Sequence, residues 1–416
     1  MILLVCDHAK RELVHLKLLR KKLNSLNIRA VIVNKHSILR AYNYYRPQII
    51  IFPHARLFLS KNIDKLYKKV TLVLIPSEHC ALNIEFIKLH YCGYLKNNKI
   101  KSSHQKMDYV FVQGSFIKKH LVKNNYIKKE KIIISGHLHY DFWSKPYEKK
   151  NKQVKNIGIA LTNELATKRH ENKNFLKTLF LLNNDIKFHK NYWRLLQMNY
   201  DFYYVCLVFD LIKKLVNTFK VSLRTHVVDV ESKFNFIKSN NFTHTNKENS
   251  HEWIRKQDLI ISTVSFMNID AYVFKRPHIS LFKLIPKEFI FKAYKSFTYR
   301  EFSEPNSFKP KTLNELFDNI KKIKFKKNKK LDNKLKLFYN YPYKEKPVNI
   351  IGEKLLEILS KNNYKFSHVA LSKDKFFLKI FGKSVGSFLV YQSSQLFNLI
   401  KFRENSKNWY FDFFFK

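Results

Sequence analysis

Glycine is scarce in this chain, with seven among 416 residues, where average usage of about 7% would give roughly 29. The phosphate-cradling motif Gly-x-Gly-x-x-Gly is absent. Cysteine is scarce too. The four cysteines, Cys6, Cys80, Cys92 and Cys206, have the spacing of neither a disulfide scaffold nor a metal site. These absences exclude a small disulfide-stabilised fold, and they fit a reducing, cytoplasmic setting.

Long hydrophobic runs are also missing. No apolar stretch approaches the roughly 18 residues that a membrane-spanning helix needs. The apolar start Ile2–Cys6 is much shorter than the core of a signal peptide, no basic residues precede it, and Asp7 and His8 follow at once. We therefore expect Ile2–Cys6 to be a buried first strand, in a protein that does not cross a membrane.

Acidic residues are outnumbered by basic ones. The chain has 78 Lys and Arg against 32 Asp and Glu, a formal net charge of +46. Such an excess attracts polyanions, and aromatic side chains can stack on bases, so a basic nucleic-acid-binding protein is one alternative. The charge is spread along the whole chain, however, and no pattern of a nucleic-acid-binding module occurs. We therefore expect no nucleic-acid partner.

Uninterrupted β-branched and apolar runs recur in the first 140 residues. They predict strands at Ile2–Cys6, Ala30–Asn34, Gln48–Phe52, Val70–Ile75, Tyr109–Val112 and Lys131–Ser135. Leucines at three- and four-residue steps in Lys10–Leu26 predict an amphipathic helix, and Ser37–Tyr45 predicts another. Strands without polar alternation are buried on both faces, so this sheet should be parallel, with helices on each side.

A second set of elements begins at Asn156. Its expected strands are Ile157–Leu161, Lys220–Leu223, Leu259–Thr263 and Ile279–Leu281, and its expected helices are Asn191–Phe219 and those around His251–Lys256 and Ile269–Phe274. The predicted fold class is α/β, with two Rossmann-like domains facing a cleft. We expect an acceptor-side domain at residues 1–145 and a nucleotide-donor domain at 150–345. A basic aromatic tail, 346–416, should pack on the first domain or lie on a membrane.

The most informative segment runs from Val221 to Ser280. A strand that ends at Leu223 delivers Arg224 and His226 to its carboxyl edge, where open α/β sheets bind ligands. Arginine can donate two parallel hydrogen bonds to phosphate oxygens, and a histidine can add another. The next strand leads into the hydroxyl residues Ser262, Thr263 and Ser265 and then into a helix with Asp270, which can accept from ribose hydroxyls. The alternative is structural, with the hydroxyls as helix caps.

These residues resemble the bacterial glycosyltransferases of surface-carbohydrate biosynthesis with the GT-B fold, and more distantly the CMP-sugar and glycerophosphate transferases. The family's Arg-x-His segment, later acid, Ser/Thr loop and acidic helix are matched by Arg224, His226, Glu231, 262–265 and Asp270. Segments 75–78, 108–114, 135–141 and 159–163 resemble further family motifs in the expected order. The chain departs from the pattern at Val227, where the family usually has proline, at Asp270, where glutamate is commoner, and at Lys275, where a glycine is usual.

The resemblance implies an enzyme that moves a sugar from a nucleotide-activated donor to a surface polysaccharide or a lipid-linked glycan. It also implies that no metal and no cofactor is needed. A CDP-polyol transferase of the same fold is the alternative. The implied donor-binding residues are Asn163, Arg224, His226, Glu231, Ser262, Thr263, Ser265 and Asp270. Glu78 is the expected catalytic carboxylate with Asp7 in reserve, and the implied hinge contains Gly136, His139 and Asp141.

Two basic segments are candidates for contact with an anionic membrane. They are the lysine-dense Lys321–Lys336 and the tail segment Phe376–Phe402, in which apolar and aromatic residues alternate with lysines. This contact would make the enzyme a peripheral protein at the inner face of the cytoplasmic membrane. The alternative is that the tail packs on the first domain and the lysines are only solvated.

Overall fold

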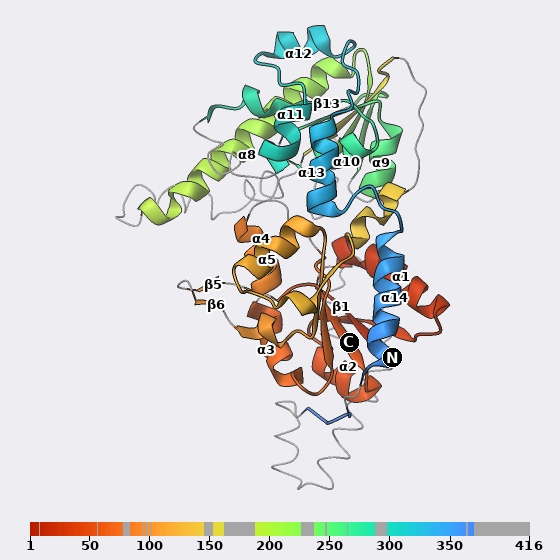
Figure 1. Cartoon of the computed structure of the whole chain (residues 1–416). Helices are drawn as coiled ribbons and strands as arrows, with labels where there is room; N and C mark the ends of the chain where they lie inside the picture. Colours follow the sequence, from red (N-terminus) through yellow and green to blue (C-terminus); the bar gives the residue numbers. More distant parts are fainter. Residues whose placement is uncertain are drawn as a thin grey trace. The chain divides into compact units, whose positions relative to one another are not determined.

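The computed structural model describes residues 1–7, 9–55, 57–77, 84–93, 95–96, 99–100, 102–144, 153–161, 188–225, 237–245, 248–263, 265–287, 298–362 and 365–369. The chain forms two compact units (Figure 1). Unit 1 contains Met1–Asp141 and the chain from Leu335 onward, and unit 2 contains Phe142–Lys334. The sequence predicts residues 335–345 in the donor domain. The structure places these residues in unit 1, where Phe338 stacks on Phe116 with ring centroids 4.4 Å apart.

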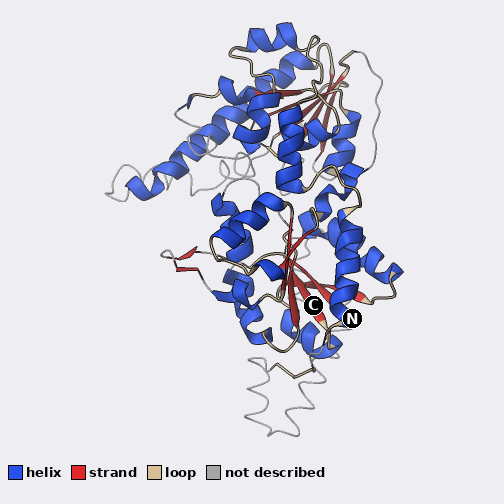
Figure 2. Ribbon diagram, viewed as in Figure 1, coloured by secondary structure: helices blue, strands red, loops and turns tan. Residues whose placement is uncertain are grey.

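Unit 1 is built on a six-stranded parallel sheet with helices on both faces (Figure 2). Its strands, in the order β2-β1-β3-β4-β7-β8, are Ala30–Asn34, Ile2–Cys6, Ile49–Phe52, Thr71–Leu74, Tyr109–Val112 and Ile132–Ile134. All neighbouring strands pair in parallel. The chain adds β2 on one side of β1 and β3 on the other, so the strand order reverses at β1. Ligands of open α/β sheets bind at such a reversal, beside the carboxyl ends of the strands.

The helices of unit 1 cover that sheet. They are α1 (Ala9–Ser25), α2 (Ile38–Tyr45), α3 (Leu57–Leu66), α4 (Ile84–Cys92), α5 (Ser115–Lys123) and α14 (Pro347–Ser360), and a small hairpin joins β5 (Leu95–Lys96) to β6 (Lys99–Ile100). The leucines that predicted α1 lie in the hydrophobic core. Helix α14 packs against α1 and adds Val348, Ile351, Leu355 and Ile358 to the same core (Figure 1). The last described segment, 365–369, also contacts unit 1.

That terminal segment is held by α2. The Asn43 side chain accepts from the Val369 amide at 2.9 Å and donates to the Val369 carbonyl at 2.8 Å, while the Tyr42 hydroxyl donates to the Ser367 carbonyl at 2.8 Å. The Arg46 guanidinium lies over the Phe366 ring. The described chain up to Val369 thus packs on unit 1. The membrane candidate Phe376–Phe402 lies outside the described residues.

Unit 2 has a five-stranded parallel sheet of order β11-β10-β9-β12-β13. In that order the strands are Phe242–Thr245, Lys220–Arg224, Asn156–Ala160, Leu259–Ser262 and His278–Ser280. The central strand β9 pairs with β10 on one side and with β12 on the other, so this sheet also reverses its order beside its first strand. Two parallel sheets with helices confirm the predicted α/β class with two Rossmann-like domains.

The helices of unit 2 are α8 (Phe188–Leu215), α9 (Ser250–Lys256), α10 (Met267–Val273), α11 (Glu304–Asn306) and α12 (Leu313–Asn319), and α13 (Lys329–Tyr339) contains the return to unit 1. Tyr204, Val208 and Leu211 of α8 lie in the core beside β9 and β10. The lysine-dense segment also contributes to a core: Leu331 and Leu335 of α13 are buried, while Lys329, Lys330 and Lys336 are exposed. Its apolar side is therefore already covered.

Candidate functional site

Arg224 ends strand β10, at the carboxyl edge of the sheet in unit 2. It lies opposite Ala160 of the central strand β9 in the parallel register. This edge, beside the reversal of strand order, is where α/β sheets bind ligands. The sequence predicted this position, because the apolar strand residues stop at Leu223 and the arginine follows directly.

The guanidinium of Arg224 is buried, with 9% of the residue exposed. Its Nη1 donates to the Glu248 carbonyl at 2.6 Å, and within the described part of the chain this is its one hydrogen bond. Burial lowers the pKa of Arg224, while the negative charges of Glu248 and Asp270 oppose that shift. Since a guanidinium carries five N–H donors, most of its donors are available for a ligand at the sheet edge.

The hydroxyl residues at the end of β12 and just after it, here called the hydroxyl loop, are buried. They are Ser262, Thr263 and Ser265. Ser262 donates to Asn268 Oδ1 at 2.6 Å and lies 2.8 Å from His278 Nε2, and burial lowers the pKa of His278 to about 3. Ser265 accepts from the amide of Met267, the first residue of the short helix α10, at 3.1 Å. Thr263 is buried beside them. These contacts favour the structural alternative for Ser262 and Ser265.

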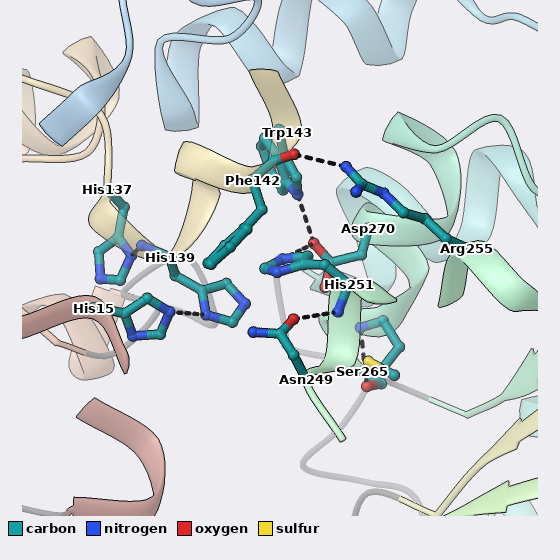
Figure 3. A network of polar contacts seen from close by, with 11 residues as sticks. His15, His137, His139, Phe142, Trp143, Asn249, His251, Arg255, Ser265 and Asp270 are labelled. Carbon is teal, nitrogen blue, oxygen red and sulfur yellow. Dashed lines mark hydrogen bonds and ion pairs between the residues drawn. The ribbon is translucent and has the colours of Figure 1, made fainter. Parts of the chain in front are cut away.

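Asp270 of α10 is bound within unit 2 (Figure 3). Its Oδ1 accepts from Trp143 Nε1 at 2.7 Å and lies 3.4 Å from His251 Nε2, and only 2% of Asp270 is exposed. The Phe142 carbonyl accepts from Arg255 Nη2 at 3.1 Å, and the Phe142 ring packs on His251. The carboxylate that sequence reasoning assigned to the ribose therefore anchors the first residues of unit 2.

Several expected site residues lie outside the described residues. They are Glu78, Asn163, His226 and Glu231. Their roles remain predictions.

Asp7 follows β1, at the reversal point of the sheet in unit 1. Its Oδ1 lies 2.6 Å from Lys35 Nζ, just after β2, and its Oδ2 lies 2.9 Å from His54 Nε2, just after β3. Sequence reasoning missed Lys35 and His54. The signal was present, because each is a polar residue within two positions of the carboxyl end of a parallel strand.

These two partners change the acidity of Asp7. Burial alone would raise the pKa of its carboxyl, but the hydrogen bonds and charges of His54 and Lys35 outweigh burial and hold that pKa well below its ordinary value. A general base works best when its pKa lies near the working pH. Asp7 is thus better suited to orient Lys35 and His54 than to take a proton.

The three hinge residues make contacts inside unit 1. Gly136 has a φ of +79°, and a Cβ there would lie 2.7 Å from the Tyr343 ring. Asp141 Oδ1 accepts from the Val348 amide at 3.2 Å and so binds the start of α14. His139 Nδ1 lies 3.0 Å from His15 Nε2 on α1 (Figure 3). The segment that leaves unit 1 is therefore fixed to it by α1 and α14.

Solved structures with a similar fold include the wall teichoic acid polymerase TagF. A TagF variant soaked with CDPG matches with a TM-score of 0.54 at 12% identity, over 87% of this chain and 89% of that one. A second TagF structure gives 0.53 at 14% identity, over 88% and 90%. UDP-GlcNAc 2-epimerase from Methanocaldococcus jannaschii, in complex with UDP-GlcNAc and UDP, gives 0.48 at 12% identity, over 87% and 100%. The likeness to TagF confirms the expected GT-B type of fold.

No protein-family model and no curated protein matches the sequence. Among the described residues, none of the helices combines the length and the apolar character required to span a bilayer.

Proposed function

We propose that this chain is a transferase that takes its donor as a nucleotide-activated group and delivers that group to a cell-surface polymer or to its lipid-linked precursor. The observation that carries the proposal is the buried Arg224 guanidinium at the carboxyl edge of β10. A buried cation with spare N–H donors, placed where α/β sheets bind ligands, fits the phosphates of a nucleotide. The GT-B type of fold supports the same reading.

The group transferred has two candidates. A glycosyl group follows from the resemblance of the sequence motifs to surface-carbohydrate glycosyltransferases. A polyol phosphate from a CDP-activated donor is favoured by the likeness to TagF, which was soaked with CDPG. Both donors present nucleotide phosphate, so both give Arg224 the same task, and the base and the activated group distinguish them.

Donor binding tests this function. Isothermal titration of the full-length protein with UDP-GlcNAc, CMP-sugar, GDP-sugar and CDP-glycerol should show saturable binding of one nucleotide class. Arg224→Ala should weaken that binding by about 2–5 kcal/mol, because a desolvated phosphate would lose its charged partner. Arg224→Lys should recover part of the loss, since the charge returns without the paired donors.

The matched control lies on the same strand. Lys220 begins β10 at the opposite, amino edge of the sheet and is exposed. Lys220→Ala removes the same charge from the same strand and should leave donor affinity unchanged. Equal affinities of wild type and Arg224→Ala, with circular dichroism showing an intact fold, would refute the donor site, and so would a failure of every donor to bind.

A further inference from the structure

A small cavity lies at the carboxyl edge of the sheet in unit 1, where β1, β3 and β4 end. Apolar residues of these strand ends and of α1 make most of its wall. Its polar lining comes from Glu12, His15, Ser77 and His137. The interior measures about 20 Å³, which is room for one water molecule or one hydroxyl group.

The carboxylate residue in the lining of this cavity is Glu12. It lies in the first turn of α1 and is 1% exposed. Its Oε1 accepts from the Ser77 hydroxyl at 2.8 Å, and its Oε2 accepts from the Asp7 amide at 2.7 Å. Glu12 also lines the cavity, so a hydroxyl group that enters the cavity comes next to this side chain.

The two bonds hold the carboxylate still. One donor follows β1 and the other follows β4, so two strand ends of the rigid sheet fix the orientation of Glu12. Groups held in place before the reaction need no rearrangement during it, and this is the usual source of catalytic advantage. The position matters as well, because the cavity lies beside the β1/β3 reversal, where ligands of such sheets bind.

From this geometry we infer that the cavity binds the attacking hydroxyl of the acceptor and that Glu12 is the general base that removes its proton. The inference rests on the proposed transferase function and assigns its acceptor-side residue. Asp7 keeps a positioning role, through its amide to Glu12 and its carboxylate to Lys35 and His54. Ser77 is a second positioning residue.

In the step assigned to Glu12, the acceptor O–H bond breaks and its proton passes to the carboxylate. The electron pair left on the acceptor oxygen forms the new bond to the donor, at the anomeric carbon of a sugar or at the phosphorus next to a polyol. The donor's bond to the nucleotide phosphate oxygen breaks, and its electron pair leaves with the nucleotide. Glu12 then returns the proton to solvent.

Water can serve as the test acceptor, because the cavity has room for it. The experiment measures hydrolysis of whichever of the four titrated donors binds, with glycerol as a second acceptor. Glu12→Gln keeps the shape of the side chain and removes its basicity. We expect this variant to bind the donor within twofold of wild type and to turn it over at least about 100-fold more slowly.

The matched control is Glu85→Gln, which removes an exposed carboxylate that pairs with Lys88 on α4 of the same unit. It should turn over the donor at the wild-type rate. Near-wild-type turnover by Glu12→Gln would overturn the inference while leaving the donor site intact. So would a wild-type protein that binds the donor but never hydrolyses it. Failure of the donor to bind at all refutes the transferase itself.

Ser77→Ala provides a second test if Glu12→Gln does not fold. Loss of the Ser77 hydrogen bond removes a donor that stabilises the charged form of Glu12, so the acid limb of the rate profile should move to higher pH. A purely structural Ser77 would lower stability and leave the limb where it is. An unmoved acid limb would overturn the assignment of Glu12.

Discussion

The indole N–H of Trp143 donates to the carboxylate of Asp270 at 2.7 Å, and both residues are buried in unit 2. Trp143 belongs to the first residues of the unit, and Asp270 lies on α10, more than 120 positions later. This bond ties the entry of the chain to the helix that follows the hydroxyl loop. Asp270 therefore acts first as an anchor.

Removing the anchor should destabilise unit 2. Asp270→Ala leaves a buried indole N–H without its acceptor, which costs about 1–3 kcal/mol. Trp143→Phe deletes the donor, and a double-mutant cycle in urea should return a coupling energy above about 0.5 kcal/mol. If Asp270→Asn instead weakens donor binding strongly while stability is unchanged, the carboxylate contacts the ligand as the sequence had indicated.

The buried imidazole of His278 makes unit 2 sensitive to acid. Burial lowers the pKa of His278 from 6.5 to about 3. As pH falls below 6.5, the imidazole binds a proton in the unfolded chain and not in the folded chain. The free energy of unfolding therefore decreases. Between pH 6.5 and pH 5 this amounts to about 2 kcal/mol.

Urea unfolding of wild type and His278→Asn at pH 7 and pH 5 measures this effect. The variant should lose less stability between the two pH values, whatever its stability at pH 7. His368→Asn, which alters an exposed histidine of the terminal segment, should behave as wild type. If His278→Asn loses as much stability between pH 7 and pH 5 as wild type does, then other groups take up the proton.

Helix α14 should contribute strongly to the stability of unit 1. Ile351 and Leu355 are fully buried in its core, and truncation of such side chains costs about 2–5 kcal/mol. Leu355→Ala should therefore lower the urea midpoint of unit 1 clearly. The next residue gives the control, because Leu356 is 43% exposed and Leu356→Ala should cost well under 1 kcal/mol. Equal losses would mean that α14 does not pack as described.

Any attraction of the lysine-dense segment to membranes should be electrostatic. Leu331 and Leu335 are already buried, so the fully exposed residues of the segment are lysines and Asn333. Each lysine near an anionic surface contributes about 1 kcal/mol. Replacing Lys326, Lys327 and Lys330 by glutamine should reduce co-sedimentation with phosphatidylserine vesicles about 100-fold at low salt. The signal should vanish at high salt, where charges are screened.

The control for that measurement is a variant with the same net charge. Glutamine at Lys119, Lys123 and Lys128, all exposed in unit 1, should reduce vesicle binding much less. Equal reductions would show that the overall charge of the chain, and no particular segment, attracts the vesicles.

The local pattern of apolar residues was sufficient to predict the buried strands. Ala30–Asn34 and Tyr109–Val112 have in the structure the bounds that the sequence predicts, because unbroken apolar runs are typical of strands covered on both faces. Strand β11, Phe242–Thr245, was missed because it lies at the edge of its sheet and its sequence, FTHT, is half polar. An edge strand needs little apolar surface and leaves little signal.

The site could be predicted only one residue at a time. The sequence places Asp7 and Arg224 at strand ends, because each follows an apolar run directly. It does not show that Lys35 and His54 meet Asp7, since these residues are 28 and 47 positions away and only the order of the strands brings them together. Glu12 escaped notice for another reason. An acid in the first turn of a helix is so common that the pattern carries no functional signal.

The two crossings between the units have a consequence for translation. Domains usually finish folding in the order in which the ribosome makes them. Here the sheet of unit 1 is synthesised first, but α14, which completes its core with Val348, Ile351 and Leu355, emerges after the whole of unit 2. The nascent amino-terminal part of unit 1 therefore exposes apolar surface until α14 has been synthesised. During this interval a chaperone could bind that surface.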